Sequence, residues 1–541
     1  MDNSNNNSLT TGEPKSGKKK RSKRKYSTEK SEKTFFAKLK NWWPFSRVSG
    51  RIISIYLLTI VIGGFLLSIP GVVKEESNFW NFITGMFTAS SAFSDTGITM
   101  IQTNIGYSFF GQFLILLLIQ MGGIGILTVK IVFLVFLNKK ISLDDQSVAN
   151  TERGSNSLAN TVEMIKDAFF FLLSVEIIGV FILFFGFYFT PMSKSYLQEN
   201  PNTTTNPYHN FGTSLWASIF HSVSAVNNAG FDILSGNSLQ PYNQDDSRGY
   251  ILQFTFLAQW IIGGLGYPTY HDIKRKFRAR KLGKKVKFSL FTKLNFIVYV
   301  TLFILGPVLV FLSEYLTIEN SAILLNKDSN GKHSEKIWKP AYVWIIDILF
   351  NVSSCRNAGF ASVDINNFTA GSKFILSIWM FIGAAPSSTA GGIRTTTLAI
   401  CFIAIFSIMR NKSSTEAFKK RIPDETVKRS FAVVLLSFMI VLVSIYVVYL
   451  DSNEMLFNTD DSKNTESTII KLIVYVCSAF GTVGFQPFTN GQIIQMGVIS
   501  KIMLVLTMFI GQLGISNTLL AFVKPKNKQN YGYLEEDVTI G

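Results

Sequence analysis

Four short segments, each with a serine six positions before a glycine, carry the clearest chemical signal in this sequence. The glycines are Gly97, Gly230, Gly359 and Gly484, and each follows an apolar stretch too short to cross a membrane. Glycine adopts backbone angles that residues with a Cβ avoid, so it can aim consecutive backbone carbonyls at one point. Rings of backbone carbonyls can replace the hydration shell of a cation such as potassium. The four segments therefore predict a cation-selectivity filter.

The alternative is that these are ordinary glycines at helix ends. A single occurrence would favour that interpretation, whereas four copies in register favour a filter. The predicted filter residues are Thr96, Gly97, Ala229, Gly230, Ala358, Gly359, Val483 and Gly484. Neighbouring residues expected to support the filter loops are Asp95, Asn228, Arg356, Asn357 and Thr482.

A second candidate segment interrupts the apolar window 374–409. Proline, paired glycines and small hydroxyl residues cannot sustain a helix there. A nucleotide phosphate loop is disfavoured, because the GxxxxGK[ST] spacing is absent and no strand precedes the segment. The segment contains Gly383, Ala384, Ala385, Pro386, Ser387, Ser388, Thr389, Ala390, Gly391, Gly392 and Arg394.

Long apolar helices must position these loops. Hydrophobic residues make up 47% of the 541 residues, Phe occurs 48 times and only 16% are charged, which is too apolar for a soluble protein. Crossing a membrane takes about 20 helical residues, and backbone polarity in lipid forces such spans to be helices. Windows long and apolar enough are 52–69, 109–137, 168–190, 250–266, 294–312, 431–450 and 498–523.

The net charge of +17 is unevenly distributed along the chain. Basic residues gather in the N-terminal tail, at 139–140, 274–287 and 410–429, and after the last window, whereas the intervening loops 193–210, 317–334 and 451–466 carry little positive charge. Such a pattern follows the positive-inside rule and does not indicate nucleic-acid binding. It predicts that both termini are cytoplasmic, which requires an even number of crossings.

The glycine segments divide the chain into four similar units, each a helix, a pore helix, a glycine loop and a helix. The predicted fold class is an all-α polytopic membrane protein, with eight transmembrane helices in four parallel repeats around a pseudo-fourfold pore. An inverted-repeat transporter would need an odd number of crossings per repeat. The predicted units are a disordered basic cytoplasmic tail (1–46), repeats at 47–138, 160–270, 288–410 and 425–524, and a cytoplasmic C-terminal tail (525–541).

The four glycine loops resemble the filters of the Trk/Ktr/HKT superfamily of potassium transporters, over about residues 50–541. The resemblance implies the membrane subunit of a bacterial Ktr/Trk-type system for potassium uptake across the plasma membrane. Plant members with serine at the first filter position are sodium-selective, so Gly97 implies a preference for potassium. The resemblance also implies that the segment from Gly383 to Arg394 is an intramembrane gate beneath the filter.

The same resemblance implies a homodimer and a separate cytosolic ring of nucleotide-binding regulatory subunits. Membrane lipid is the other expected partner, and nucleic acid is not expected. No cofactor is expected in this chain and no metal apart from the transported K⁺, with coupling to Na⁺ or H⁺ left open. Enzyme activity is disfavoured, because no cluster of residues with catalytic spacing is visible.

Two positions depart from the family pattern. The family usually has lysine where this chain has Arg394, and commonly has Gly-Arg-Val-Gly where this chain has Gln512 in the second position.

Glu176 lies within an apolar window, where ionisable residues are costly, and either a structural or a pore role is open for it. His221 is expected to pack on its pore helix rather than to bind metal. The alternative function is an alternating-access secondary transporter of another cation or solute.

Overall fold

The fold is described from a computed structural model that covers residues 48–74, 76–137, 146, 161–201, 204–236, 238–325, 338–457 and 465–518. The two predicted tails, 1–46 and 525–541, lie outside these residues. The described part is mostly helical, and its sheets are two antiparallel hairpins of two strands each.

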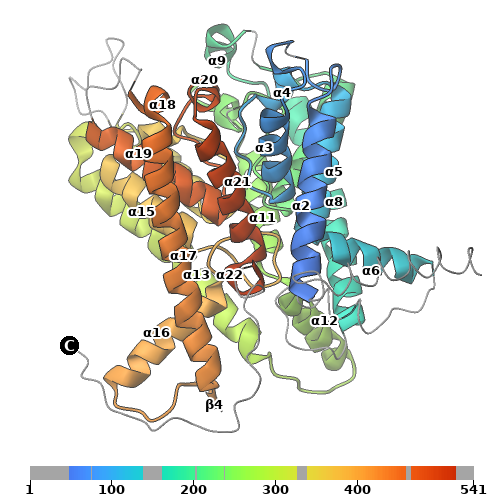
Figure 1. Cartoon of the computed structure of the whole chain (residues 1–541), viewed down its shortest axis with the longest axis vertical. Helices are drawn as coiled ribbons and strands as arrows, with labels where there is room; N and C mark the ends of the chain where they lie inside the picture. The colour runs from blue at the N-terminus through green and yellow to red at the C-terminus, as the bar shows by residue number, and fades with distance from the viewer. Residues whose placement is uncertain are drawn as a thin grey trace, which may run out of the picture.

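One order of elements recurs along the chain: a long helix, a short helix that ends at a filter glycine loop, and a second helix that stops at a break (Figure 1). The first set is α2 (Val48–Leu67), η1 (Glu76–Asn78), α3 (Phe82–Phe93), α4 (Thr103–Gly106), α5 (Phe109–Ile124) and α6 (Ile126–Phe136). The second is α8 (Thr161–Phe189), α9 (Lys194–Glu199), α10 (Phe211–Val226), η2 (Gln240–Tyr242), β1 (Asn243–Gln244), β2 (Ser247–Arg248), α11 (Tyr250–Gly264) and α12 (Tyr267–Lys281).

The later two sets follow the same order. The third is α13 (Leu290–Leu316), η3 (Ile318–Asn320), α14 (Ala341–Ser354), η4 (Ile365–Asn367), α15 (Ala370–Phe381), α16 (Thr395–Met409), β3 (Glu416–Ala417) and β4 (Lys420–Arg421). The fourth is α17 (Asp424–Asp451), α18 (Asn453–Phe457), α19 (Thr465–Gly481), α20 (Asn490–Ile494), α21 (Val498–Leu513) and α22 (Ile515–Thr518).

The long helix of each set is apolar along most of its length. Among the described residues, α2, α8, α13 and α17 are the four helices long and apolar enough to cross a membrane, and α5 with α6 would make a fifth as one bent span. Only 22–44% of each of the four long windows is buried, so most of their apolar surface faces outward. A water-soluble protein does not expose apolar surface on that scale, so the chain is a multi-pass membrane protein. The count of eight crossings stays a prediction.

The second helices are interrupted where the sequence predicts continuous windows. Window 109–137 bends by 89° between α5 and α6. The break falls at Gly125, and its counterparts are Gly266 after α11 and Gly514 after α21, with φ of +86°, +80° and +80°. A residue in this left-handed conformation ends a helix, and glycine adopts it without steric cost. In the third set, a loop separates α15 from α16.

The short helices α3, α10, α14 and α19 aim their C-terminal ends at the glycine loops. Asn81 and Asn210 fix the starts of α3 and α10, because their side chains accept hydrogen bonds from the first-turn amides of Thr84 (3.2 Å) and Thr213 (3.1 Å). The long helices α2 and α8 pack against α3 and α10. The negative ends of the four helix dipoles therefore point toward the loops, where a cation would be stabilised.

Candidate ion filter and gate loop

The four filter glycines meet one another in cyclic order. Their φ angles are +84°, +68°, +75° and +106° for Gly97, Gly230, Gly359 and Gly484. An added Cβ would contact a carbonyl oxygen of the next loop: that of Ala229 for Gly97 (2.5 Å), Ala358 for Gly230 (2.8 Å), Val483 for Gly359, and Thr96 for Gly484 (2.5 Å). The structure thus brings all eight predicted filter residues together, and any side chain larger than hydrogen at these glycines would displace a carbonyl.

In three of the four loops, the serine six positions before the glycine has a structural role that the sequence did not reveal. In three loops its carbonyl accepts the amide of the residue before the glycine: Ser91 from Thr96 (2.8 Å), Ser224 from Ala229 (2.8 Å) and Ser478 from Val483 (2.9 Å). The hydroxyls of two of them also hold the loop, because Ser224 Oγ donates to the Phe231 carbonyl (3.0 Å) and Ser478 Oγ accepts from the Gly484 amide (3.0 Å). These bonds turn the chain sharply from helix to filter.

The third loop departs from the other three. Asp95, Asn228 and Thr482, two residues before their glycines, have positive φ angles of +52°, +60° and +50°, whereas Asn357 does not. The Ala358 amide bonds instead to the carbonyl of Ser354 (2.8 Å), as in a continuing helix. The pseudo-fourfold symmetry is therefore approximate at this loop.

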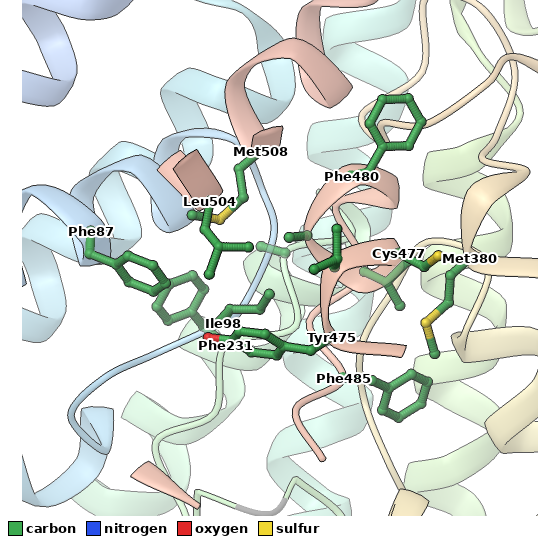
Figure 2. Close-up of a cluster of buried hydrophobic side chains, with 14 of the residues drawn as sticks. Phe87, Ile98, Phe231, Met380, Tyr475, Cys477, Phe480, Phe485, Leu504 and Met508 are labelled. Carbon is green, nitrogen blue, oxygen red and sulfur yellow. The ribbon is translucent and has the colours of Figure 1, made fainter. Parts of the chain in front are cut away.

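Apolar side chains anchor the loops immediately after the glycines. Ile98, Phe231, Phe360 and Phe485 are between 0 and 4% exposed. Ile98, Phe231 and Phe485 lie in one buried cluster with Tyr475 on α19, as Figure 2 shows. Because each anchor adjoins a filter glycine, the packing of this cluster holds the carbonyls in place.

A cavity of about 310 Å³ opens onto the filter and is called the mouth here. All four filter glycines line it, together with polar residues that follow them, including Asp232, Asp364 and Gln486. The loop residues that line the mouth follow the glycines in sequence, whereas Asn228 and Thr482, which precede their glycines, lie on the opposite side and bond to the segment between α15 and α16.

The loop between α15 and α16 lies on that opposite side and is called the gate loop (382–394). Its residues are mostly buried, with Ala384, Ala385, Thr389 and Ala390 fully enclosed. Its backbone bonds to the ends of neighbouring second helices: the Ala385 amide to Gly264 O (3.2 Å), Tyr267 N–H to Ser387 O (3.0 Å) and Gly392 N–H to Gly511 O (3.2 Å). The loop therefore spans the second, third and fourth sets of elements.

Apart from Arg356, which is described below, three filter-support residues are hydrogen-bonded to this loop or are linked to it by Gln512. The Asn228 amide donates to Thr389 Oγ1, and Thr482 Oγ1 accepts from the Gly391 amide (2.8 Å). Gln512 Nε2 donates both to Asp95 Oδ2 (3.2 Å) and to the Thr389 carbonyl (3.1 Å). The gate loop and the bases of three filter loops are consequently one hydrogen-bonded network.

Two arginines brace the gate loop through hydrogen bonds to backbone carbonyls. Arg394 donates to the carbonyls of Ala390 and Gln512, the latter at 2.7 Å. Arg356, only 2% exposed, donates to the Gly383 carbonyl (3.2 Å), and its guanidinium lies 4.1 Å from the centre of the Tyr299 ring. A cation over an aromatic face is stabilised by the ring quadrupole, which helps Arg356 to stay charged inside the protein.

Glu176, whose role was left open, lies behind the second filter loop. Its carboxylate accepts from Gln120 Nε2 (3.2 Å) and from Asn227 Nδ2 (3.2 Å), so its partners are side-chain amides rather than backbone groups or arginine. His221 bonds to its own helix as expected, and it also pairs with Asp232. Within the described residues no group of His, Cys, Asp and Glu could hold a metal ion.

Fold and site together define a multi-pass helical membrane protein with four glycine loops around one axis. A family model described as "Cation transport protein" (TrkH) matches residues 43–531. An uncharacterized cation transporter of Mycoplasma genitalium is 31% identical, with 91% of this chain and 97% of the relative covered. The Ktr system potassium uptake protein D of Bacillus subtilis is 29% identical over 90% of this chain and 95% of its own length.

Among solved structures, the potassium transporter TrkH from Vibrio parahaemolyticus superposes with a TM-score of 0.58, at 15% identity, and covers 88% of this chain and 85% of its own. That likeness shows the fold. The chain belongs to the TrkH family of cation transport proteins, as a membrane subunit of the Trk/Ktr superfamily.

Proposed function

We propose that this chain is the pore-forming subunit of a potassium uptake system, and that K⁺ passes through the ring of four glycine loops. The ring of carbonyls carries the proposal: the oxygens of residues 96, 229, 358 and 483 each lie against a filter glycine of an adjoining loop. Carbonyl oxygens supply ligands to a dehydrated K⁺ without burying a fixed charge. Relatives named as potassium uptake proteins support K⁺ as the cargo.

The proposal includes eight crossings in four parallel repeats, with both termini in the cytoplasm. It is supported by the basic helix α12 and the β3–β4 hairpin, which lie at one end of the molecule, opposite α4, α9 and α20 (Figure 1). Basic segments stay on the cytoplasmic side of a membrane. Impermeant thiol labelling tests the assignment: Lys284→Cys should label only from inside and Gln244→Cys only from outside, and the reverse pattern would reject it.

In this proposal, the gate loop closes the path beneath the filter. Support comes from its burial and from hydrogen bonds that join it directly to the second, third and fourth filter loops and, through Gln512, to the first. Homodimerisation and a cytosolic nucleotide-binding ring, implied by the resemblance, are also part of the proposal. The exposed basic residues of α12 offer the ring a docking surface.

Rubidium uptake in a bacterial host that lacks its own potassium uptake systems tests the proposal. Intact protein should restore growth at low potassium, and Gly97→Ser and Gly484→Ser should lower Rb⁺ uptake or admit more Na⁺, because the new Cβ displaces a carbonyl. Gly491→Ser is the matched control, since a Cβ there meets nothing within 4 Å. If intact, well-expressed protein with a regulatory partner moves neither K⁺ nor Rb⁺, an alternating-access transporter of another solute becomes the better description.

A further inference from the structure

A buried histidine and a buried aspartate meet beside the second filter loop. His221 lies on the pore helix α10, and Asp232 lies two residues after Gly230. Nε2 of His221 is 2.9 Å from Oδ1 of Asp232, and the two side chains are only 1% and 4% exposed. Neither residue belongs to the carbonyl ring or to the gate loop.

Hydrogen-bond geometry decides how many protons this pair carries. Nδ1 of His221 lies 2.7 Å from the carbonyl oxygen of Ala217, which can only accept, so Nδ1 bears a proton. Nε2 faces a carboxylate oxygen, so another proton must lie between these two atoms. The Ile233 amide lies 3.5 Å from Nε2, too far to compete with the 2.9 Å contact.

The hydrogen bonds to Asp232 place that proton on the histidine. Asp232 already accepts hydrogen bonds from the amides of Leu234 (2.8 Å), Ser235 (3.0 Å) and Ser238 (3.0 Å), which stabilise a charged carboxylate. Aromatic rings surround the imidazole, with centroid distances of 5.6 Å for Phe187, 5.8 Å for Phe220, 5.9 Å for Phe256 and 6.4 Å for Phe360. These rings bury the contact, and the three amide bonds to Asp232 decide in favour of a salt bridge between an imidazolium and a carboxylate.

The pair connects the pore helix with the chain that leaves the filter. Only Phe231 separates Gly230 from Asp232, so fixing the carboxylate restricts where the Ala229 and Gly230 carbonyls can point. Asp232 also lines the mouth. Its charge is offset by His221, so the pair adds a rigid contact to the mouth without adding net charge.

The other three loops have no such pair at the same positions. His221 lies nine residues before its glycine and Asp232 two residues after it. At these two positions the first loop carries Thr88 and Thr99, the third loop Phe350 and Ala361, and the fourth loop Tyr475 and Gln486. Thr88 instead accepts from the Tyr107 hydroxyl (3.1 Å), and Gln486 accepts from the Thr99 amide (2.9 Å). Among the described filter loops, the second is thus the one held by opposite charges.

We propose that His221 and Asp232 are positioning residues that hold the second filter loop at the spacing that suits K⁺, and so set its discrimination against Na⁺. The inference rests on the proposed potassium uptake and adds a determinant of selectivity to it. A filter loop freed from this brace can close around a smaller cation, so loss of the pair should change selectivity more than maximal uptake.

The test measures ⁸⁶Rb⁺ and ²²Na⁺ uptake in the same potassium-uptake-deficient host, per amount of protein in the membrane. Asp232→Asn keeps the side-chain volume and one acceptor but removes the charge, and His221→Gln removes the other charge. Each should raise the Na⁺-to-Rb⁺ uptake ratio about tenfold, equivalent to ~1.4 kcal/mol of discrimination. The double variant should differ little from either single one, because both remove the same contact. His209→Gln, an exposed histidine, is the control.

The outcomes separate this inference from the proposed function. If intact protein takes up Rb⁺ and both variants keep its Na⁺-to-Rb⁺ ratio, the pair is a packing feature only and the inference is wrong. The same holds if the variants lose thermal stability in detergent without a change in that ratio. If His221→Gln does not reach the membrane, Asp232→Asn alone decides. Failure of intact protein to take up Rb⁺ rejects the proposed function itself.

Discussion

Replacing Gln512 with leucine should weaken the closed gate loop. The change removes two buried hydrogen bonds, one to the Asp95 carboxylate and one to the Thr389 carbonyl. Only the bond to Thr389 joins the Gln512 side chain to the gate loop, and a neutral hydrogen bond contributes about 0.5–1.5 kcal/mol, so the closed loop loses about that much if the open loop does not make this bond. A loss of about 1 kcal/mol shifts the ratio of closed to open loop about fivefold toward open.

Basal Rb⁺ uptake in the absence of a regulatory partner is the direct assay for this shift. Uptake by Gln512→Leu should exceed that of intact protein severalfold, after normalisation to protein in the membrane. Gln495→Leu, a substitution of the same type at an exposed position, should leave uptake unchanged. If Gln512→Leu is present at normal levels with unchanged basal uptake, the bonds from Gln512 do not hold the gate closed.

Three further substitutions test the packing around the filter and the cytoplasmic end. Phe485→Ala empties a site that is 4% exposed and should cost about 3–5 kcal/mol, seen as a lower unfolding midpoint in detergent; an unchanged midpoint would contradict the anchoring role. Gly263→Ala should reduce the yield of folded protein, because its Cβ would strike the Val226 carbonyl, and a normal yield would refute this close approach. Burial alone would raise the pKa of Asp272, but hydrogen bonds from Ser289 and Thr292 and the nearby Arg275 hold it below its ordinary value. A carboxyl group with a lowered pKa stabilises the fold at all pH values above about 4. Asp272→Ala should therefore lower the free energy of unfolding by about 1–2 kcal/mol, equally at pH 5 and pH 8. A loss that differs between these two pH values would contradict this explanation.

The features that sequence predicted best are those in which local backbone geometry requires a particular residue. Pro386 and the paired glycines Gly391 and Gly392 predicted an interruption in an apolar window, and the structure ends α15 at Phe381 and resumes at Thr395. Family membership was likewise predicted from the glycine loops and is confirmed. The roles of these segments in selectivity and gating stay predictions.

Contacts between distant segments were beyond sequence reasoning. Gln512 was recognised as a departure, but its bond to Asp95 joins residues 417 positions apart and depends on how the first and fourth sets of elements pack. The breaks at Gly125 and Gly514 could have been found, because the same Gly-x-x-Gly spacing recurs in three second helices. Glycines of this spacing also allow close packing, since a Cβ on Gly122 would strike the Phe93 carbonyl.

The hydrogen bonds of Gln512 suggest how this chain functions without the arginine that the family commonly carries there. An arginine would bring a charge beside Asp95, and an arginine–carboxylate bond is stronger than the one an amide makes. Gln512 satisfies the same carboxylate as a neutral donor, while Arg394 reaches the Gln512 backbone from the gate loop instead. The positive charge is thus kept on the proposed gate loop, at Arg394, and removed from α21. Each bond between Gln512 and the gate loop has a neutral group on at least one side, so under the proposed gating we expect the closed loop to need less free energy to open than one held by an ion pair.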